Sequence, residues 1–164
     1  MDQVLLVEDD VPTREWLAEV LSAGGEPQLA HACGSVREAL DWLRDSGACA
    51  SVGVFGRGLA GSAALRAAAL LAALVAALVA QDASPDALLD ELPRVRAATL
   101  LVVGDDDASL LLAQRRALPL LGGARRMEIV PRASAARADR VATQAVGHLA
   151  TQWFAQQLPL RHLH

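Results

Sequence analysis

A glycine-rich turn at residues 56–61 holds the residue types of this chain best suited to chemistry. Its sequence, Gly-Arg-Gly-Leu-Ala-Gly, has the spacing Gly-x-Gly-x-x-Gly, follows an apolar run and precedes a helical pattern. Such a turn can expose a nucleophile, or it can hold a phosphate on its amides and on the helix dipole. If the turn binds a phosphate, Arg57 is expected to contact the anionic ligand. Asp82, which follows the next apolar run, is then expected to bind a ribose. That interpretation predicts a nucleotide site made of Gly56, Arg57, Gly58, Gly61 and Asp82.

Two acids, Asp9 and Asp10, follow Glu8 at the end of the first apolar run. Carboxylate oxygens are ligands that Mg²⁺ accepts, so Asp9 and Asp10 are candidate metal ligands, and Asp107 could complete the site. Acids at the start of a helix also complement its dipole. We favour this helix-capping role over a metal site. We therefore expect no cofactor, with magnesium or a nucleotide as the alternatives.

Strand-like and helix-like patterns alternate six times along the chain without a long linker. The predicted strands are Gln3–Val7, Gln28–His31, Ser51–Phe55, Leu74–Ala80, Ala98–Val103 and Arg126–Val130. The predicted helices are Pro12–Ala23, Ser35–Asp45, Gly61–Leu71, Pro85–Leu92, Ala108–Leu121 and Ala138–Gln157. Ser35 and Glu38 have the spacing of a capping box, and Ser84 before Pro85 indicates another helix start.

Runs such as Thr99–Val103 are apolar throughout, which is typical of parallel strands covered by helices on both faces. The expected fold is a three-layer α/β/α sandwich with a doubly wound, mostly parallel, six-stranded sheet of Rossmann-like or flavodoxin-like winding. The single domain spans residues 1–158, and residues 159–164 form a tail. Right-handed crossovers place a switch point between the first and third strands, with residues 8–10 beside the turn at 56–61.

Composition excludes several functions. All fifteen basic residues are arginine, so mechanisms that need a lysine amine are excluded. The net charge of −4 and the scattered arginines predict no nucleic-acid partner. Cys33 and Cys49 lack metal-site spacing, and with no secretory signal a cytoplasmic location is expected. The charge-free run at 67–80 is shorter than the roughly 20 residues that cross a bilayer, so no membrane partner is expected.

Four segments, taken in chain order, have the sequence patterns expected of one class of enzyme fold. Residues 52–60 suit a strand and nucleophile elbow, and residues 95–107 suit a strand and loop that deliver an acid. Residues 126–131 suit the strand before a base, and residues 146–158 suit a closing helix. In this order, residues 51–158 resemble an α/β-hydrolase, in particular the dienelactone hydrolase-like branch.

The resemblance implies a catalytic triad that this chain does not complete. The nucleophile position is Gly58, and the base position falls at about Ala135, with no histidine between His31 and His148. Only the acid position is filled, by Asp107. A serine or cysteine nucleophile needs a base to take its proton and an acid to orient that base. The resemblance therefore predicts a pseudoenzyme in which Asp107 is a remnant acid.

The first part of the chain suits a different family. Residues 4–10 suit a strand with an acid pair, and residues 13–21 and 32–40 suit two helices of the same unit. Residues 1–48 thus resemble the start of a response-regulator receiver domain. Receivers hold Mg²⁺ beside a phosphoacceptor aspartate after the third strand, and that position is Gly56 here. The chain also has no lysine to contact a phosphoryl group.

We therefore expect a degenerate α/β-hydrolase-like domain that acts as a noncatalytic binding or interaction module. The first alternative is a receiver-like signalling domain that lacks the phosphoacceptor aspartate. The second alternative is a nucleotide-binding domain that uses the turn at 56–61. The expected partner is a small molecule or a protein, and an exposed apolar helix face would allow a homodimer.

Overall fold

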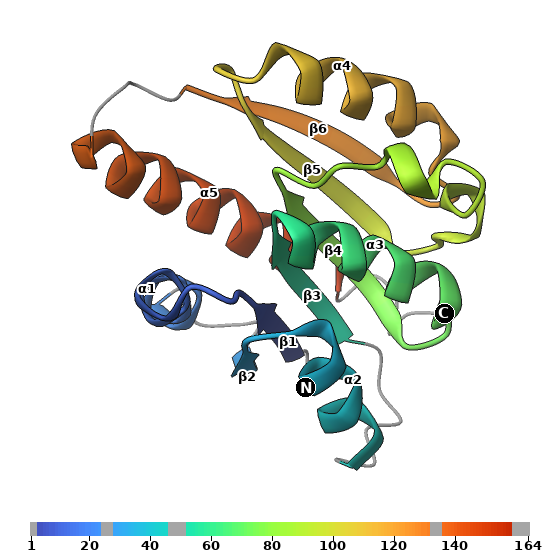
Figure 1. The fold of residues 1–164 in the computed structure, drawn as a ribbon. Coiled ribbons are helices and arrows are strands. Elements are labelled where there is room, and N and C mark those ends of the chain that lie inside the picture. The colour runs from blue at the N-terminus through green and yellow to red at the C-terminus, as the bar shows by residue number, and fades with distance from the viewer. Residues whose placement is uncertain (1–2, 24–27, 46–51, 132–135, 159–164) are drawn as a thin grey trace.

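A six-stranded parallel sheet forms the centre of the molecule (Figure 1). The structure, a computed structural model, describes residues 3–23, 28–45, 52–131 and 136–158. The strand order is β2-β1-β3-β4-β5-β6, and every neighbouring pair is parallel. The strands are β1 Gln3–Val7, β2 Gln28–Cys33, β3 Val52–Arg57, β4 Val75–Gln81, β5 Ala98–Gly104 and β6 Arg125–Val130. The predicted strands are therefore confirmed, with small differences at their ends.

Helices cover both faces of the sheet, which confirms the three-layer sandwich (Figure 1). Helices α1 and α5 pack together on one face, and α2, α3 and α4 lie on the other. Their bounds are α1 Val11–Ala23, α2 Val36–Asp45, α3 Leu59–Leu70, α4 Ala108–Ala117 and α5 Ala136–Gln157. Short 3₁₀ turns are η1 Asp86–Leu88, η2 Leu92–Arg94 and η3 Leu118–Leu120. In the described ranges no helix has both the length and the apolar character needed to cross a membrane.

Alternate residues of each strand point to opposite faces and so belong to two cores. On β1, Leu5 and Val7 belong to the core beneath α2 and α3, whereas Val4 and Leu6 belong to the core beneath α1 and α5. The α1/α5 core contains the large buried rings, such as Trp153, whose Nε1 donates a hydrogen bond to Ala98 O at 2.9 Å. Small alanines of α3 fill much of the other core.

The chain reverses its winding direction between β1 and β3, as expected. β1 pairs with β2 on one side and with β3 on the other, and Val7 lies opposite Gly56 in the β1–β3 register. The residues that follow these two positions, Glu8 and Arg57, therefore meet at the carboxyl edge of the sheet. This edge is where ligands of open α/β sheets bind.

The predicted helix Pro85–Leu92 is wrong. This segment forms the 3₁₀ turns η1 and η2, and Leu88 N donates to Pro85 O at 2.8 Å, across three residues rather than four. Pro93 disfavours the α conformation at Leu92, and a helix of about eight residues is marginal without further support. Leu88 and Leu92 are nevertheless buried, so core packing holds the segment in place.

Half of the predicted capping box at the start of α2 is present, because Ser35 caps Glu38 N but the Glu38 carboxylate accepts from Gly34 N rather than from Ser35 N. Glu38 N donates to Ser35 Oγ at 3.2 Å, and Gly34 N donates to Glu38 Oε2 at 3.0 Å. Ser84 has a different role from the predicted helix cap. Its backbone N donates to Ser62 Oγ at 3.0 Å, and Ser62 Oγ donates to Ser84 O at 3.1 Å. This pair of bonds ties α3 to the segment after β4.

Candidate active site

The turn between β3 and α3 has the sharp backbone of a nucleophile elbow. Gly58, at its tip, has φ of 60° and ψ of −126°, a conformation that residues with a side chain adopt only under strain. Gly58 N donates to Gln81 O at 2.8 Å, which fixes the turn against β4. A β-carbon on Gly58 would have no heavy atom within 4 Å apart from its chain neighbours. The tip therefore has space for a side chain that the sequence does not supply.

Gly56 and Gly61 allow the strand and the helix to approach closely. A β-carbon on Gly56 would lie 2.7 Å from Ala60 O, and one on Gly61 would lie 3.0 Å from Gly56 O. The distance at Gly56 is too short for a real β-carbon, and the distance at Gly61 is tighter than most real β-carbon contacts. The two glycines therefore have a packing role in the turn, and an aspartate of the receiver type does not fit at position 56 unless α3 moves.

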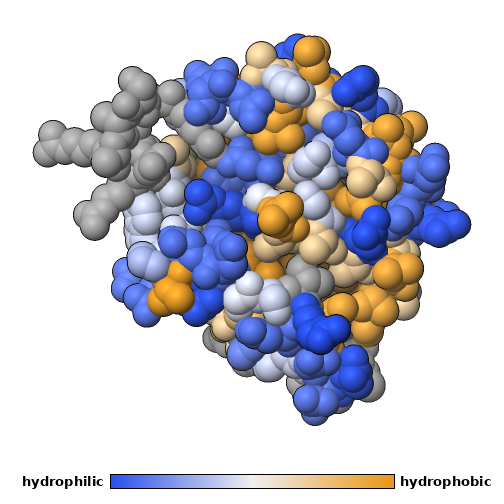
Figure 2. Space-filling view, in the orientation of Figure 1, coloured by the Kyte–Doolittle hydropathy of each residue, from blue (hydrophilic) through white to orange (hydrophobic). Residues whose placement is uncertain are grey.

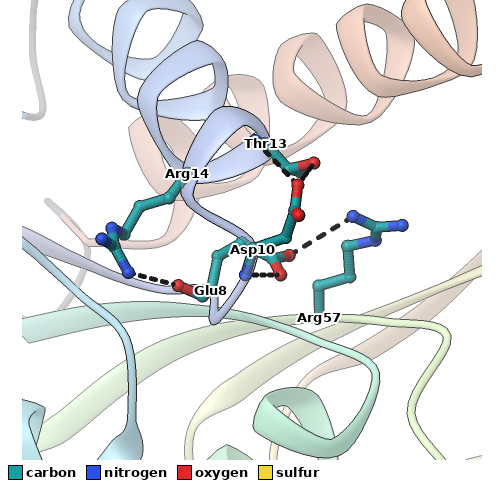
Figure 3. A network of polar contacts seen from close by, with 5 residues as sticks. All are labelled: Glu8, Asp10, Thr13, Arg14 and Arg57. Carbon is teal, nitrogen blue, oxygen red and sulfur yellow. Dashed lines mark hydrogen bonds and ion pairs between the residues drawn. The ribbon is translucent and has the colours of Figure 1, made fainter.

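A buried carboxylate faces this turn from the end of β1 (Figure 3). Glu8 is 2% exposed, its Oε1 accepts a hydrogen bond from Asp10 N at 3.1 Å, and its Oε2 lies 3.5 Å from Arg57 Nη1. Burial raises the pKa of Glu8, the Asp9 carboxyl raises it further, and the Asp10 amide and Arg57 lower it in part. The predicted placement of residues 8–10 beside the turn is therefore confirmed.

Asp10 caps helix α1. Its Oδ2 accepts hydrogen bonds from Thr13 N at 3.1 Å and from Thr13 Oγ1, and these bonds lower the pKa of Asp10. Arg14 Nη1 donates to Glu8 O at 3.0 Å, so the start of α1 is tied to the end of β1 (Figure 3). Within the described residues no group of three or more His, Cys, Asp or Glu side chains could hold a metal ion. A metal site at Asp9 and Asp10 stays a prediction.

The two other predicted acids have structural partners. Asp107, the remnant acid, caps α4, because its Oδ1 accepts a hydrogen bond from Leu110 N at 2.9 Å. Asp82 follows β4 with φ of 51°, and its Oδ1 accepts a hydrogen bond from Gly104 N at 3.4 Å. Its carboxylate therefore helps to join the ends of β4 and β5. A ribose-binding role for Asp82 stays a prediction.

The two described histidines lie outside the turn region. His31, on the edge strand β2, stacks on Trp42 with ring centroids 5.7 Å apart and an interplanar angle of 8°. His148 is exposed on α5. The expected base position, Ala135, lies outside the described residues.

Gln81, a polar residue of this edge, was not identified from the sequence, and Glu8 was identified only as part of a loop. Gln81 ends β4, is 5% exposed and lies opposite Arg57 in the β3–β4 register. The available signal was local, because Glu8 and Gln81 each end an otherwise apolar run. Their shared face depends on strand pairing, which the local pattern does not give.

The strand order, the covering helices and the elbow define the α/β-hydrolase fold. The chain is similar to dienelactone hydrolase from Anabaena variabilis, with 28% identity and a TM-score of 0.75 over 96% of this chain and 86% of that one. It is also similar in fold to a monoacylglycerol lipase from Paleococcus ferrophilus, with 15% identity and a TM-score of 0.66 over 92% and 94% of the two chains. These likenesses confirm the predicted resemblance.

A third solved structure, MGS-MChE2, an α/β-hydrolase from a lagoon-sediment metagenome at Mar Chica in Morocco, gives a similar result. Its identity is 16% and its TM-score 0.68, over 95% of this chain and 91% of that one. No protein-family model matches the chain, and no curated protein matches it in sequence. The fold is therefore shown by three-dimensional likeness.

An apolar surface runs along α3 on the face seen in Figure 2. Leu59 is 88% exposed and Leu70 is 70% exposed. Between them, α3 lines a hollow of about 400 Å³ together with Leu40 and Leu88. An exposed apolar helix face is thus present, and a homodimer through it stays a prediction.

Proposed function

We propose that this chain is a noncatalytic binding module on an α/β-hydrolase scaffold, and that its ligand binds between residues 8–10 and the turn at 56–61. The observation that carries the proposal is Gly58. The elbow has the strained backbone that presents a nucleophile and space for a side chain, but the tip residue has no attacking atom.

The acid position supports the same conclusion. In a triad the acid orients the base, and the base takes the proton of the nucleophile. Here Asp107 Oδ1 accepts a hydrogen bond from Leu110 N, so this carboxylate stabilises the start of α4. The described histidines are an edge-strand residue stacked on Trp42 and an exposed residue of α5. Among the described residues, the carboxyl edge therefore has groups that can bind a ligand and no nucleophile paired with a histidine base.

The test is an assay of ester hydrolysis with p-nitrophenyl acetate. We expect the chain and the Asp107→Asn variant to show the same rate as buffer, because the elbow tip is Gly58 and, among the described residues, no histidine is oriented by Asp107. Asparagine is as good a helix cap as aspartate, so Asp107→Asn should fold. Arg115→Gln, at an exposed position of α4, is the control. Turnover that Asp107→Asn removes and Arg115→Gln retains would show a working active site and refute the proposal.

Two other measurements discriminate the alternative functions. Thermal stabilisation by NAD, FAD or ATP that Gly58→Val abolishes would favour nucleotide binding, since helix α3 begins at Leu59, directly after Gly58. A mass increase after incubation with acetyl phosphate and Mg²⁺ would favour receiver-like signalling. We expect neither result.

A further inference from the structure

The outer strand β6 is more exposed than the strand beside it. It pairs with β5 on one side and is the last strand in the sheet that the described residues form. Every residue of β5 is buried, whereas Arg125, Arg126 and Ile129 of β6 are exposed. An exposed edge strand offers a row of backbone N–H and C=O groups to another strand. A strand that pairs with β6 has to match both these groups and the side chains beside them.

The register with β5 fixes which backbone groups of β6 point outward. Thr99 N donates to Ala124 O at 2.8 Å, and Asp105 N donates to Val130 O at 3.1 Å. Every second residue between these acceptors therefore directs its backbone toward β5, and the residues in between direct theirs to the open side. The outward-facing residues are Arg125, Met127 and Ile129.

The charges of β6 are complementary to a second copy of the same strand. Arg126 and Glu128 form an ion pair on one face of β6, with Arg126 exposed and Glu128 half-buried. If a second β6 runs antiparallel and Met127 lies opposite its own copy, Arg126 lies opposite the partner's Glu128. The four charges then alternate in sign around a square. Opposite charges across two strands stabilise a sheet, and like charges directly opposite destabilise it.

The same register also fits the backbone. The N–H and C=O groups of Met127 point outward, so two copies of Met127 can exchange both hydrogen bonds of an antiparallel pair. Arg126 and Glu128 then form the non-hydrogen-bonded pairs, in which opposite side chains come closest. A parallel second strand in register would instead place Arg126 opposite Arg126. Charge therefore selects an antiparallel pairing with two-fold symmetry, which closes at two copies.

Apolar side chains at the two ends of β6 favour this arrangement. Ile129 is 41% exposed near the carboxyl end of β6, and Leu120 is 40% exposed on η3, which contacts β6. Pairing centred on Met127 places Ile129 opposite the partner's Arg125. Arg125 Nη1 donates to Leu121 O at 3.1 Å, so the Arg125 side chain lies beside η3. Ile129 of each copy can then pack on the aliphatic part of Arg125 and approach Leu120 of the other copy.

We propose that β6 binds a second copy of this chain by antiparallel strand pairing centred on Met127, so that two sheets join into one. The occupant is a second copy because the sequence of β6 carries its own charge complement. Strands β4 and β5 separate β6 from the turn at 56–61. The interface therefore lies apart from the proposed ligand site, and the inference does not depend on the proposed function.

Sedimentation of the full chain over a range of concentrations tests the dimer. We expect a reversible monomer–dimer equilibrium with a Kd of about 1–100 μM, as suits a small interface. Added salt should weaken the dimer, because it screens exposed ion pairs. Arg126→Glu and Glu128→Arg should each weaken it about tenfold or more, because each variant places like charges opposite one another at both cross-strand pairs.

Rescue experiments locate the contact. An equimolar mixture of the Arg126→Glu and Glu128→Arg chains should form a heterodimer about as tightly as the parent chain, because every cross-strand pair is again opposite in charge. The double variant with both changes should recover the homodimer for the same reason. The matched control is Arg44→Glu, which reverses one charge of the exposed Asp41–Arg44 ion pair on α2. It should leave the Kd unchanged.

The contrary outcomes are equally definite. A chain that stays monomeric at millimolar concentration would overturn the proposal, and so would a dimer that Arg126→Glu retains. Arg126 is exposed, so this variant should fold even if Glu128→Arg does not. Folded single variants that fail to associate in the mixture would also refute the pairing. A dimer that Leu70→Glu abolishes and Arg126→Glu retains would instead place association on the α3 face.

Discussion

Gly56 and Gly58 are two residues apart in one turn, yet a methyl group added to each would meet different surroundings. At Gly56 it would lie 2.7 Å from Ala60 O, a backbone atom held by helix α3. At Gly58 it would enter open space, and the only penalty would come from the positive φ of 60°. One glycine is required by packing and the other by backbone conformation.

We therefore expect Gly58→Ala to lower the free energy of unfolding by about 1–3 kcal/mol, the usual cost of a side chain in such a backbone conformation. Gly56→Ala should lower the free energy of unfolding by more, because the added methyl group would overpack the turn and displace α3. Urea unfolding followed by circular dichroism measures both. Equal losses for the two variants would contradict the different roles assigned to these glycines.

At the scale of elements, the packing of α5 on β3 depends on a missing side chain. Gly53, in the middle of β3, lies against the ring of Phe154, and a β-carbon there would be 2.8 Å from Phe154 Cδ1. Phe154 is fully buried in the α1/α5 core. Gly53 thus leaves the space in which the Phe154 ring of α5 packs on the sheet.

This fit predicts an energetic coupling. Gly53→Ala alone should lower the free energy of unfolding by about 1–3 kcal/mol through overpacking, and Phe154→Leu alone by about 1–2 kcal/mol through a partial cavity. The double variant should lose less than the sum, by about 1 kcal/mol or more, because the smaller side chain gives room to the new methyl group. A double-mutant cycle in urea measures this difference. Strict additivity would mean that the two residues do not share this contact.

The strands and the switch point could be predicted from sequence because their signals are local. Long apolar runs such as Val75–Gln81 and Ala98–Gly104 are buried on both faces, and only parallel strands between two helix layers require this. Pro85–Leu92 could not be predicted in the same way. Its apolar spacing is helical, but Pro93 and the short length favour 3₁₀ turns, and packing decides between the two.

The candidate site was predictable only in part, for a related reason. Gly58 and Asp107 were located by their place in the hydrolase pattern, and the structure gives each a defined role in a turn or a cap. The pairing of Gln81 with Arg57 was not predicted, because the two residues are 24 positions apart in sequence and lie opposite each other only through strand register. Pairing between strands is a property of the fold and not of either segment.

At the scale of the whole molecule, one sheet serves two cores. Each strand of the sheet sends alternate side chains to the α2/α3 side and to the α1/α5 side, so loss of either core removes support from the same strands. By this argument we expect the described residues to unfold as one cooperative unit, and the single domain of residues 1–158 stays a prediction. Domains of about this size usually unfold in a single transition.

Two tryptophans allow this cooperativity to be measured from both sides. Trp42 packs against the α2/α3 core, and Trp153, 6% exposed, belongs to the α1/α5 core. In variants with Trp16→Phe and only one of these two tryptophans kept, fluorescence reports on one core and far-ultraviolet circular dichroism on the whole fold. We expect the two urea midpoints to coincide within each variant, because the loss of either core removes support from the strands that also form the other core. A fluorescence midpoint that precedes the circular dichroism midpoint in one variant would mean that its core unfolds separately, and the sheet would then join two units.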